Sequence, residues 1–303
     1  MKVLVTGSTG LVGNALVNDL RRAGHIVCRL VRPETRVDSQ AAPAGFDVRW
    51  NPVTGELGGA AVGADAVVNL GGASIADGRW TAQRKEFLRT SRVDSTATLV
   101  KALAKMAARP RVLISASAIG YYGNRGDDVL NEQSAPGTDF LSGIATEWEA
   151  EACKAEALAI RVVLARFGVV LAKQGGALPK MAQPFRLGVG GRIGSGTQWM
   201  SWVALEDAVG VVKFAMENGN LRGPVNVVSP APVRNADFTA ALANVLHRPA
   251  LFSAPALALR LALGEMADAL LLSSQRVMPE QLQRAGYSLV HQDLGLALAS
   301  ILK

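Results

Sequence analysis

The first half of the chain alternates short apolar runs with longer amphipathic stretches. Continuous runs of apolar and β-branched residues are typical of strands that are buried on both faces of a parallel sheet. Stretches whose apolar residues recur every three or four positions are typical of the helices that connect such strands. The predicted strands are Lys2–Thr6, Ile26–Val31, Ala66–Leu70, Val112–Ser115 and Ala159–Arg166, and the predicted helices are Leu11–Ala23, Ser91–Ala107 and Ala145–Ala157. This order predicts an α/β protein with a doubly wound parallel sheet of the Rossmann type.

The pattern changes after about residue 171. The stretch from Lys173 to Val203 is rich in Gly and Pro and has no regular period, which predicts loops around short elements. A helix and a strand are predicted next, at Leu205–Glu217 and Pro224–Val228, followed by the helices Asn235–Leu246, Ala256–Ala269, Pro279–Ala285 and Leu294–Leu302. We therefore expect a dinucleotide-binding domain over residues 1–170. Residues 171–303 are expected to return to the sheet and then form a smaller C-terminal lobe that binds the substrate.

Composition narrows the classes of ligand. Lys and Arg exceed Asp and Glu to give a net charge of +7, but they are spread along the chain rather than clustered. Neither finger spacings nor basic helices are apparent, so we expect small anionic ligands and not nucleic acid. The cysteines, Cys28 and Cys153, lie far apart and outside any CxxC, and His25, His247 and His291 are scattered. We therefore predict neither a disulfide framework nor a metal site, as suits a reducing cytoplasm.

The most apolar stretch of the second half, Leu257 to Leu272, contains Arg260, Glu265 and Asp268. These charges argue against a membrane span. The apolar run at the N-terminus is interrupted by glycines and lacks a cleavage site, so it is expected to be a strand rather than a signal peptide.

Three glycines directly follow the first predicted strand, in the spacing GxxGxxG. The first, Gly7, permits a tight turn, Gly10 lets the backbone approach a pyrophosphate, and Gly13 lets the helix pack closely on the strand. The phosphates would then meet the free N–H groups and the positive end of the helix. This context predicts nucleotide binding. The predicted contacts in this turn are Gly7, Thr9, Gly10, Leu11, Val12 and Gly13.

The end of the second predicted strand indicates which nucleotide is bound. NAD-binding folds of this type place an acid there to bind the ribose hydroxyls, but Val31 is followed by Arg32 and no acid occurs until Glu34. A guanidinium can bind a 2′-phosphate in bidentate fashion. We therefore predict NADP(H), with Val31 and Arg32 as contacts, and further arginines at Arg29 and Arg36.

Several separated motifs resemble one family over nearly the whole chain. They are VTGSTGLVG, VVNLGGASI, RKEFLRTSRV, ISASAIGYYG, DFLSGIATEWEAEA, LARFGVVLAKQGGAL and SSQRVMPEQLQRAGY. Together they resemble the extended branch of the short-chain dehydrogenase/reductase superfamily. The likeness is closest to its atypical epimerase-like subfamily, whose members are often labelled nucleoside-diphosphate-sugar epimerases.

The resemblance implies further cofactor contacts on matching residues. It implies that Asn69, Leu70, Gly71 and Gly72 line the adenine and pyrophosphate side. It places Arg92 beside a cofactor phosphate or ribose, with a surface salt bridge as the alternative role. Ser115 and Val170 are expected to border the nicotinamide, and Ser117 fits the hydroxyl position of the superfamily's catalytic residues.

The usual Tyr-x-x-x-Lys pair is absent, because alignment places Leu141 and Ala145 at its positions. One explanation is that another group supplies the proton. The candidates for this role are Tyr121, Tyr122, Glu147 and Glu149, and we select Ser117 and Tyr121 as the candidate catalytic residues. Alternatively, the substrate brings its own acid or base. The third possibility is a non-catalytic NADP(H)-binding sensor or interaction protein.

The predicted substrate side departs from the extended-family pattern. Met200 and Ser201 stand where that pattern commonly has Arg and Asp, and Trp199 and Trp202 flank them as an expected aromatic wall. Either of two arginines in this region, Arg186 or Arg192, could meet an anion or face water. The sequence thus favours oxidoreductase or epimerase-type hydride chemistry on an unidentified small molecule. It leaves a homodimer open, since related folds often pair through helices.

Overall fold

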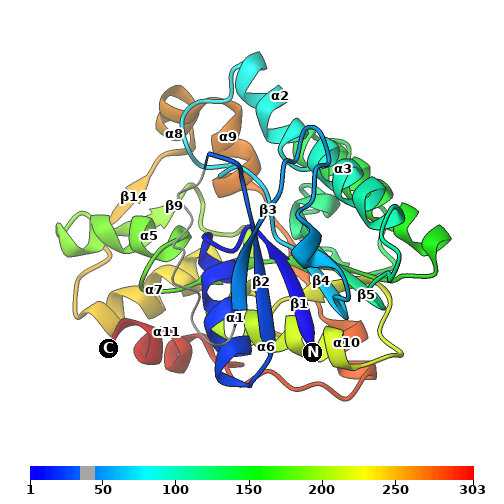
Figure 1. The fold of residues 1–303 in the computed structure, drawn as a ribbon. Helices are drawn as coiled ribbons and strands as arrows, with labels where there is room; N and C mark the ends of the chain where they lie inside the picture. Colours follow the sequence, from blue (N-terminus) through cyan, green and yellow to red (C-terminus); the bar gives the residue numbers. More distant parts are fainter. Residues whose placement is uncertain (35–44) are drawn as a thin grey trace.

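The computed structural model describes residues 1–34 and 45–303. In this part of the chain seven strands form a parallel central sheet in the order β12-β7-β5-β4-β1-β2-β3 (Figure 1). The order reverses direction after β1, so that connections run to both sides, as a doubly wound sheet requires. The fold class predicted from the sequence is therefore confirmed. The strand bounds are β1 Lys2–Thr6, β2 Ile26–Val31, β3 Gly45–Arg49, β4 Ala66–Asn69, β5 Val112–Ala118, β7 Arg161–Phe167 and β12 Gly223–Val227.

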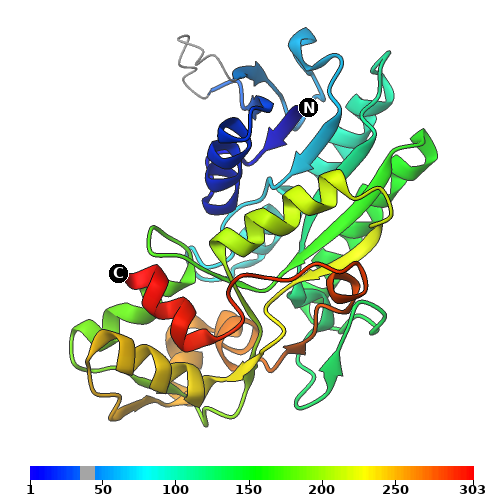
Figure 2. The same cartoon turned by 90° about the horizontal axis from the view of Figure 1, so that it is seen from below.

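Helices cover both faces of this sheet (Figure 2). On one face α1 (Leu11–Arg22) and α6 (Leu205–Glu217) pack on alternate strand residues such as Val3 and Val5. On the other face α3 (Val93–Ala104) and α4 (Phe140–Cys153) enclose a second core that contains Leu4. Because successive strand side chains point to opposite faces, one short apolar strand supplies both cores.

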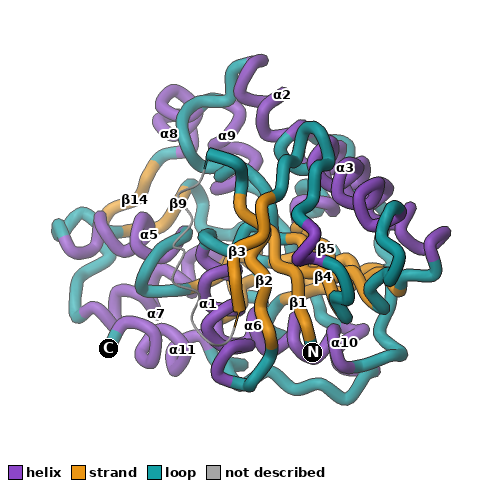
Figure 3. The backbone as a smooth tube through the Cα atoms, in the orientation of Figure 1, coloured by secondary structure: helices purple, strands orange, loops and turns teal. Residues whose placement is uncertain are grey.

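A third core belongs to the C-terminal part of the chain. Its centre is Trp202 and Phe238, both buried, together with Leu178 of α5 and Leu298 of α11. The tube in Figure 3 shows its helices beside short strands. The bounds are α5 Ala177–Arg186, α7 Asn235–Leu246, α8 Ala256–Leu263, α9 Glu265–Ala267, α10 Glu280–Arg284 and α11 Leu294–Leu302.

Short strand pairs connect parts of the C-terminal half with one another, and one pair connects it to the first half of the chain. The pairs are β8 Val169–Leu171 with β11 Trp202–Ala204, β9 Gly191–Ile193 with β14 Phe252–Ala254, β10 Trp199–Met200 with β13 Val233–Arg234, and β6 Val129–Leu130 with β15 Arg276–Val277. The remaining helices are α2 Ala82–Thr90 and the single turns η1 Gly59–Ala61, η2 Ile119–Tyr122, η3 Lys154–Leu158 and η4 Asp268–Leu272. The division of the chain at residue 170 stays a prediction.

The observed elements differ from the predicted ones in two informative places. The helix predicted from Ala145 begins at Phe140, because Asp139 caps it by accepting a hydrogen bond from the Ser142 N–H at 2.9 Å. The Gly- and Pro-rich stretch contains α5, which we predicted as loops. Pro179 lies in its first turn, where a missing N–H costs nothing, although Pro184 lies further inside.

In residues 1–34 and 45–303, no helix combines the length and the apolar character that crossing a membrane would demand.

The packing of α1 on β1 gives a first testable prediction. A Cβ at Gly13 would lie 2.2 Å from the carbonyl oxygen of Gly7, whereas a Cβ at Gly143 in α4 would meet nothing within 4 Å. We expect Gly13→Ala to lower the free energy of unfolding by about 1–3 kcal/mol, as overpacked backbones do. Gly143→Ala should instead raise it by about 0.5–1 kcal/mol, since Ala favours a helix. Urea unfolding measures both, and equal effects would contradict this packing.

Candidate functional site

The turn after β1 presents bare backbone at the carboxyl edge of the sheet. Gly7 has a φ of +62°, and a Cβ there would lie 2.4 Å from the carbonyl oxygen of Leu70. The N-cap residue of α1 is Gly10, so the helix start has no side-chain cap, and its first turn contains no acid. Among the described residues, none accepts a hydrogen bond from the N–H groups of Leu11, Val12 or Gly13. Free donors at a positive helix end are suited to an anion.

A buried network fixes the neighbouring strand end. The Thr6 hydroxyl donates to the Asn69 side-chain oxygen at 2.7 Å and accepts from the N–H groups of Leu70 and Gly71 at 3.1 and 3.2 Å. The Asn69 amide donates in turn to the Thr96 hydroxyl at 2.9 Å. The predicted contacts Leu70 and Gly71 are thus held rigidly beside the glycine turn. The resemblance places Asn69 in the cofactor-lining segment with Leu70, Gly71 and Gly72, but Thr6 was not foreseen, because it ends an otherwise apolar strand.

Ser115 belongs to the same network rather than to a free surface. It is fully buried, and its hydroxyl accepts from the Asn69 amide at 3.3 Å. Val170 lies in β8, where it pairs with Val203 of β11 and is partly buried. Thr9 is exposed in the glycine turn. The assignment of these three residues to a cofactor stays a prediction.

The end of β2 carries the predicted specificity residue. Val31 is buried and Arg32 is exposed, and the Arg32 side chain has no hydrogen bond to any residue that the structure describes. From the end of β3, Arg49 donates to the backbone carbonyl oxygens of Arg32 and Pro33. The side chain of Arg49 therefore lies against the backbone of Arg32, which places two arginines at the end of β2. Arg49 was missed because the third strand was not predicted.

The other two arginines of this region are placed differently. Arg29 forms a bidentate ion pair with Asp47, at 2.6 and 2.8 Å, so its guanidinium is already neutralised. Arg36 lies outside the described residues.

Two further guanidiniums converge beside Gly72. Arg92 donates to the carbonyl oxygens of Ala73 and Leu88 at 2.8 and 3.1 Å, and Arg84 donates to that of Ser74. In residues 1–34 and 45–303, no carboxylate pairs with either one, and the buried Nε of Arg84 has no partner. Burial and the charge of Arg84 lower the pKa of Arg92 to about 10, so it stays protonated at neutral pH.

This arrangement contradicts the alternative in which Arg92 only forms a surface salt bridge. Its guanidinium lies 3.2 Å from where a Cβ of Gly72 would be and 5.5 Å from the Trp148 ring centroid. Two like charges near consecutive carbonyl groups repel each other unless an anion joins them. Arg84 could not be recognised as a site residue from the sequence, because it lies in a helix with several other charged residues.

The candidate catalytic serine is engaged in a buried ion-pair network. The Ser117 hydroxyl donates to Glu149 at 2.6 Å, and Arg166 binds both oxygens of that carboxylate at 2.8 and 2.7 Å. All three residues are buried. Burial alone would lower the pKa of Arg166, but the bonds to Glu149 raise it overall. Because the Ser117 hydroxyl donates its hydrogen to Glu149, its oxygen can only accept a hydrogen bond from a ligand.

The two neighbouring tyrosines have different surroundings. Tyr122 is fully buried, accepts from Arg166 at 3.0 Å and donates to Asn226 at 2.7 Å. Burial raises the pKa of Tyr122 to about 12, so this phenol is a structural group at neutral pH. Tyr121 lies on η2, just after β5, with its ring centroid 3.5 Å from the Arg166 guanidinium carbon. The Tyr121 hydroxyl bonds to none of the described residues.

The two glutamates considered as proton donors, Glu147 and Glu149, both form ion pairs with arginines. Glu147 is half-exposed and forms an ion pair with Arg89 at 2.7 Å, while Glu149 belongs to the buried network. The aligned dyad positions hold no proton-transfer group, since Leu141 packs against Gly120 and Ala145 is buried. Of the proton donors that the sequence offered, Tyr121 is the one that is not already engaged.

The expected aromatic wall of two tryptophans is wrong. Trp202 is fully buried in the C-terminal core, where its Nε1 donates to the Ala231 carbonyl at 2.9 Å. The two tryptophans lie in different strands, Trp199 in β10 beside β13 and Trp202 in β11 beside β8, so they have different surroundings. Trp199 remains partly exposed, with the guanidiniums of Arg234 and Arg276 each 4.5 Å from its ring centroid. The described residues contain no group of three or more His, Cys, Asp or Glu that could hold a metal ion.

Comparison with known proteins places these features in a family context. The sequence model of the NAD dependent epimerase/dehydratase family matches residues 3–228, and that of a domain of unknown function (DUF1731) matches residues 254–301. Epimerase family protein Mb2239 of Mycobacterium bovis is 45% identical over 298 residues, which are 98% of this chain and 96% of that protein. Epimerase family protein YfhF of Bacillus subtilis is 37% identical over 303 residues, covering 100% of this chain and 98% of that protein.

The same relationship is seen among solved structures. The human epimerase family protein SDR39U1 (isoform 2), crystallised with NADPH, is 32% identical and superposes with a TM-score of 0.86. The alignment covers 99% of each chain.

The buried ion pair gives a second prediction, with a control on the same helix. Glu149→Gln should lower the free energy of unfolding by about 3 kcal/mol, because it leaves Arg166 buried without a counter-charge. Glu147→Gln should cost less than about 1 kcal/mol, because that pair is solvated. Urea unfolding of both variants tests this difference. A loss of similar size in the two would show that the Arg166 network adds nothing to stability.

Proposed function

This chain belongs to the NAD dependent epimerase/dehydratase family, and we propose that it binds NADP(H) and exchanges hydride with an oxygen-bearing carbon of a small molecule. The observation that carries the proposal is the uncapped start of α1, with free N–H groups on Leu11, Val12 and Gly13. The family match bears out the resemblance to extended short-chain dehydrogenases/reductases that the motifs indicate. A relative solved with NADPH supports the choice of cofactor.

The residues at the sheet edge fit a doubly charged dinucleotide. The first turn of α1 would take the pyrophosphate, because its N–H groups are free and no side chain covers Gly10. Arg32 would take the 2′-phosphate at the end of β2, beside Arg49. Arg84 and Arg92 add positive charge beside Gly72 without any acidic partner among the described residues. An NAD-type site would need a carboxylate where Arg32 stands.

Tyr121 is the group we assign to proton transfer. NADP(H), when bound, supplies or accepts the hydride. The Tyr121 Oη, free of internal partners, would give a proton to the substrate oxygen during reduction and take it back during oxidation. The Arg166 guanidinium under the ring holds the phenol in place. Ser117, whose proton goes to Glu149, would orient the substrate by accepting a hydrogen bond from it.

A sensor that binds NADP(H) without catalysis is the second candidate. It is favoured by the apolar side chains of Leu141 and Ala145 at the aligned dyad positions and by the engagement of Ser117 with Glu149. The two candidates share the cofactor and differ in the role of Tyr121.

Cofactor preference tests the assignment of Arg32. The wild-type protein should bind NADPH more tightly than NADH, and Arg32→Glu should weaken NADPH binding by about 10- to 100-fold, the worth of a lost charge-assisted contact. NADH binding should change far less. Arg109→Glu, an exposed change that precedes β5 at the opposite sheet edge, should leave both affinities unaltered. Equal wild-type affinities in calorimetry would refute the role of Arg32.

Loss of the Tyr121 hydroxyl tests catalysis. In NADPH oxidation assays over a panel of carbonyl compounds, Tyr121→Phe should lower the rate about 10²- to 10⁴-fold, the usual worth of a general acid. Its affinity for NADPH should not change. Tyr287→Phe, the matched change at a tyrosine packed on Phe214, should keep full activity. A wild-type protein that binds NADPH but turns over no compound would support the sensor, and an active Tyr121→Phe would exclude Tyr121 as the acid.

A further inference from the structure

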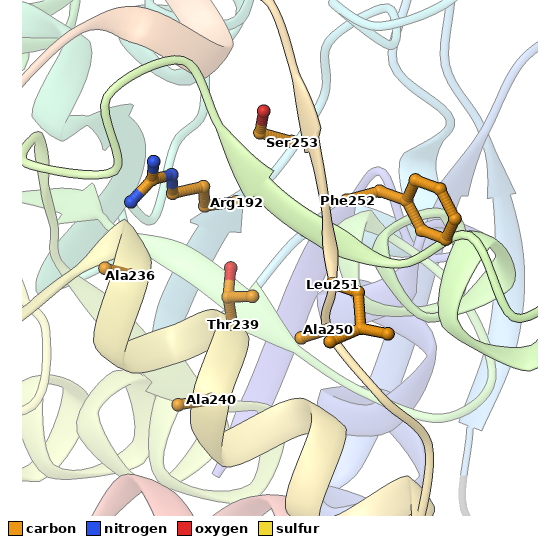
Figure 4. A pocket seen from close by; sticks show the side chains of 8 residues that line it. All are labelled: Arg192, Ala236, Thr239, Ala240, Ala250, Leu251, Phe252 and Ser253. Carbon is orange, nitrogen blue, oxygen red and sulfur yellow. The ribbon is translucent and has the colours of Figure 1, made fainter.

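A cavity lies in the C-terminal lobe, apart from the residues proposed to bind cofactor (Figure 4). It has a volume of about 410 Å³ and lies between α7 and the strand pair β9–β14. We call it the α7 pocket, and its lining residues are Arg192, Ala236, Thr239, Ala240, Ala250, Leu251, Phe252 and Ser253. Its volume is within the range of about 300–1,000 Å³ that is typical of small-molecule sites.

The sequence explains why this space is not filled. Ala236, Thr239 and Ala240 follow the spacing of one helix face, and all three have short side chains. The larger residues Phe238 and Leu242 of the same helix point into the lobe core instead. The opposite wall is a close backbone approach, since a Cβ at Gly191 would lie 1.4 Å from the carbonyl oxygen of Phe252.

Three polar groups of the α7 pocket lack partners. Arg192 and Ser253 are register partners in the parallel pair β9–β14, so their side chains share one face of the ribbon. Thr239 is only 7% exposed, yet its hydroxyl bonds to no residue that the structure describes, and the same holds for the side chains of Arg192 and Ser253. In Figure 4 the Thr239 hydroxyl points from α7 toward the two strands.

The positive charge of the α7 pocket favours a negatively charged ligand. Arg192 is the one charged residue among the eight that line it, and it has no ion pair within the described chain. The Thr239 hydroxyl has no partner among the described residues and is not itself buried, so it can bond to a ligand in the α7 pocket. A guanidinium with nearby hydroxyl donors is suited to a carboxylate or phosphate.

The rest of the wall is apolar and partly exposed. Leu251 is 83% exposed and, two residues before Ser253, lies on the same side of the chain as Ser253, so a ligand bound there would cover it. Arg192 and Phe252 lie on opposite sides of the view in Figure 4. The ligand therefore needs an anionic end and an apolar body.

We propose that the α7 pocket binds a small organic anion, with its carboxylate or phosphate on Arg192, Thr239 and Ser253 and its apolar body on Leu251, Ala240 and Ala250. This site is separate from the cofactor residues, and its occupancy does not depend on the reaction that the protein catalyses.

Calorimetry with phenyl phosphate tests the proposal, with and without saturating NADPH. Arg192→Met keeps the side-chain stem and should weaken binding about tenfold or more, and Thr239→Val, of similar shape, about threefold. The matched control is Arg186→Met, because Arg186 is an exposed arginine of the same lobe outside the α7 pocket. It should bind phenyl phosphate like the wild type. Unchanged NADPH affinity and circular dichroism would verify that the variants are folded.

Two further probes separate the parts of the ligand. Inorganic phosphate should bind about tenfold more weakly than phenyl phosphate, because it leaves the apolar wall uncovered. Benzyl alcohol, which has the ring without the charge, should give no heat. The proposal is overturned if wild-type protein does not bind phenyl phosphate or if Arg192→Met and Arg186→Met bind it alike. If inorganic phosphate and phenyl phosphate bind with equal affinity, the claim that the pocket also binds an apolar body is wrong. The comparison of the two arginine variants decides these points whether or not NADPH binds.

Discussion

The close approach of two strand ends determines the character of the site. Gly7 lies against the carbonyl of Leu70 so tightly that no side chain fits between them. The Thr6 hydroxyl holds the two strand ends together, because it donates a hydrogen bond to Asn69 and accepts hydrogen bonds from the N–H groups of Leu70 and Gly71. As a result, the free N–H groups at the start of α1 are held in fixed positions next to these strand ends. Rigid donors lose little entropy when they meet a phosphate, which is the physical basis of preorganised binding.

A second buried network surrounds the candidate catalytic serine, Ser117. Glu149 and Arg166 neutralise each other, and Ser117 donates a hydrogen bond to Glu149. The Arg166 guanidinium also lies against the Tyr121 ring and donates a hydrogen bond to the Tyr122 hydroxyl. Such a network contributes less to stability than to fixing geometry, because burying two charges offsets most of their attraction. Among the candidate proton donors, Ser117, Tyr122, Glu147 and Glu149 are engaged, whereas the Tyr121 hydroxyl bonds to none of the described residues.

The central sheet could be predicted from the sequence, and the details of the site could not. Strands β1 and β2 and helices α6, α7 and α11 were predicted with the bounds that the structure has, because their apolar periodicity is strong. The third sheet strand and α5 were missed, since short edge strands and proline-containing helices carry weak local signals. Arg84 and Thr6 were not singled out from the sequence, and the partners of Glu149, which was a candidate proton donor, were not foreseen. Their contacts are tertiary, and no local pattern encodes them.

The central claim is that the uncapped start of α1 holds the diphosphate of a dinucleotide. The most direct measurement is a crystal structure of this protein grown with NADPH. The account predicts diphosphate oxygens within hydrogen-bond distance, about 2.7–3.2 Å, of the N–H groups of the first turn of α1. It also predicts the 2′-phosphate at Arg32. A dinucleotide bound with its diphosphate away from this helix start, or no bound dinucleotide at saturating concentration, would contradict the account.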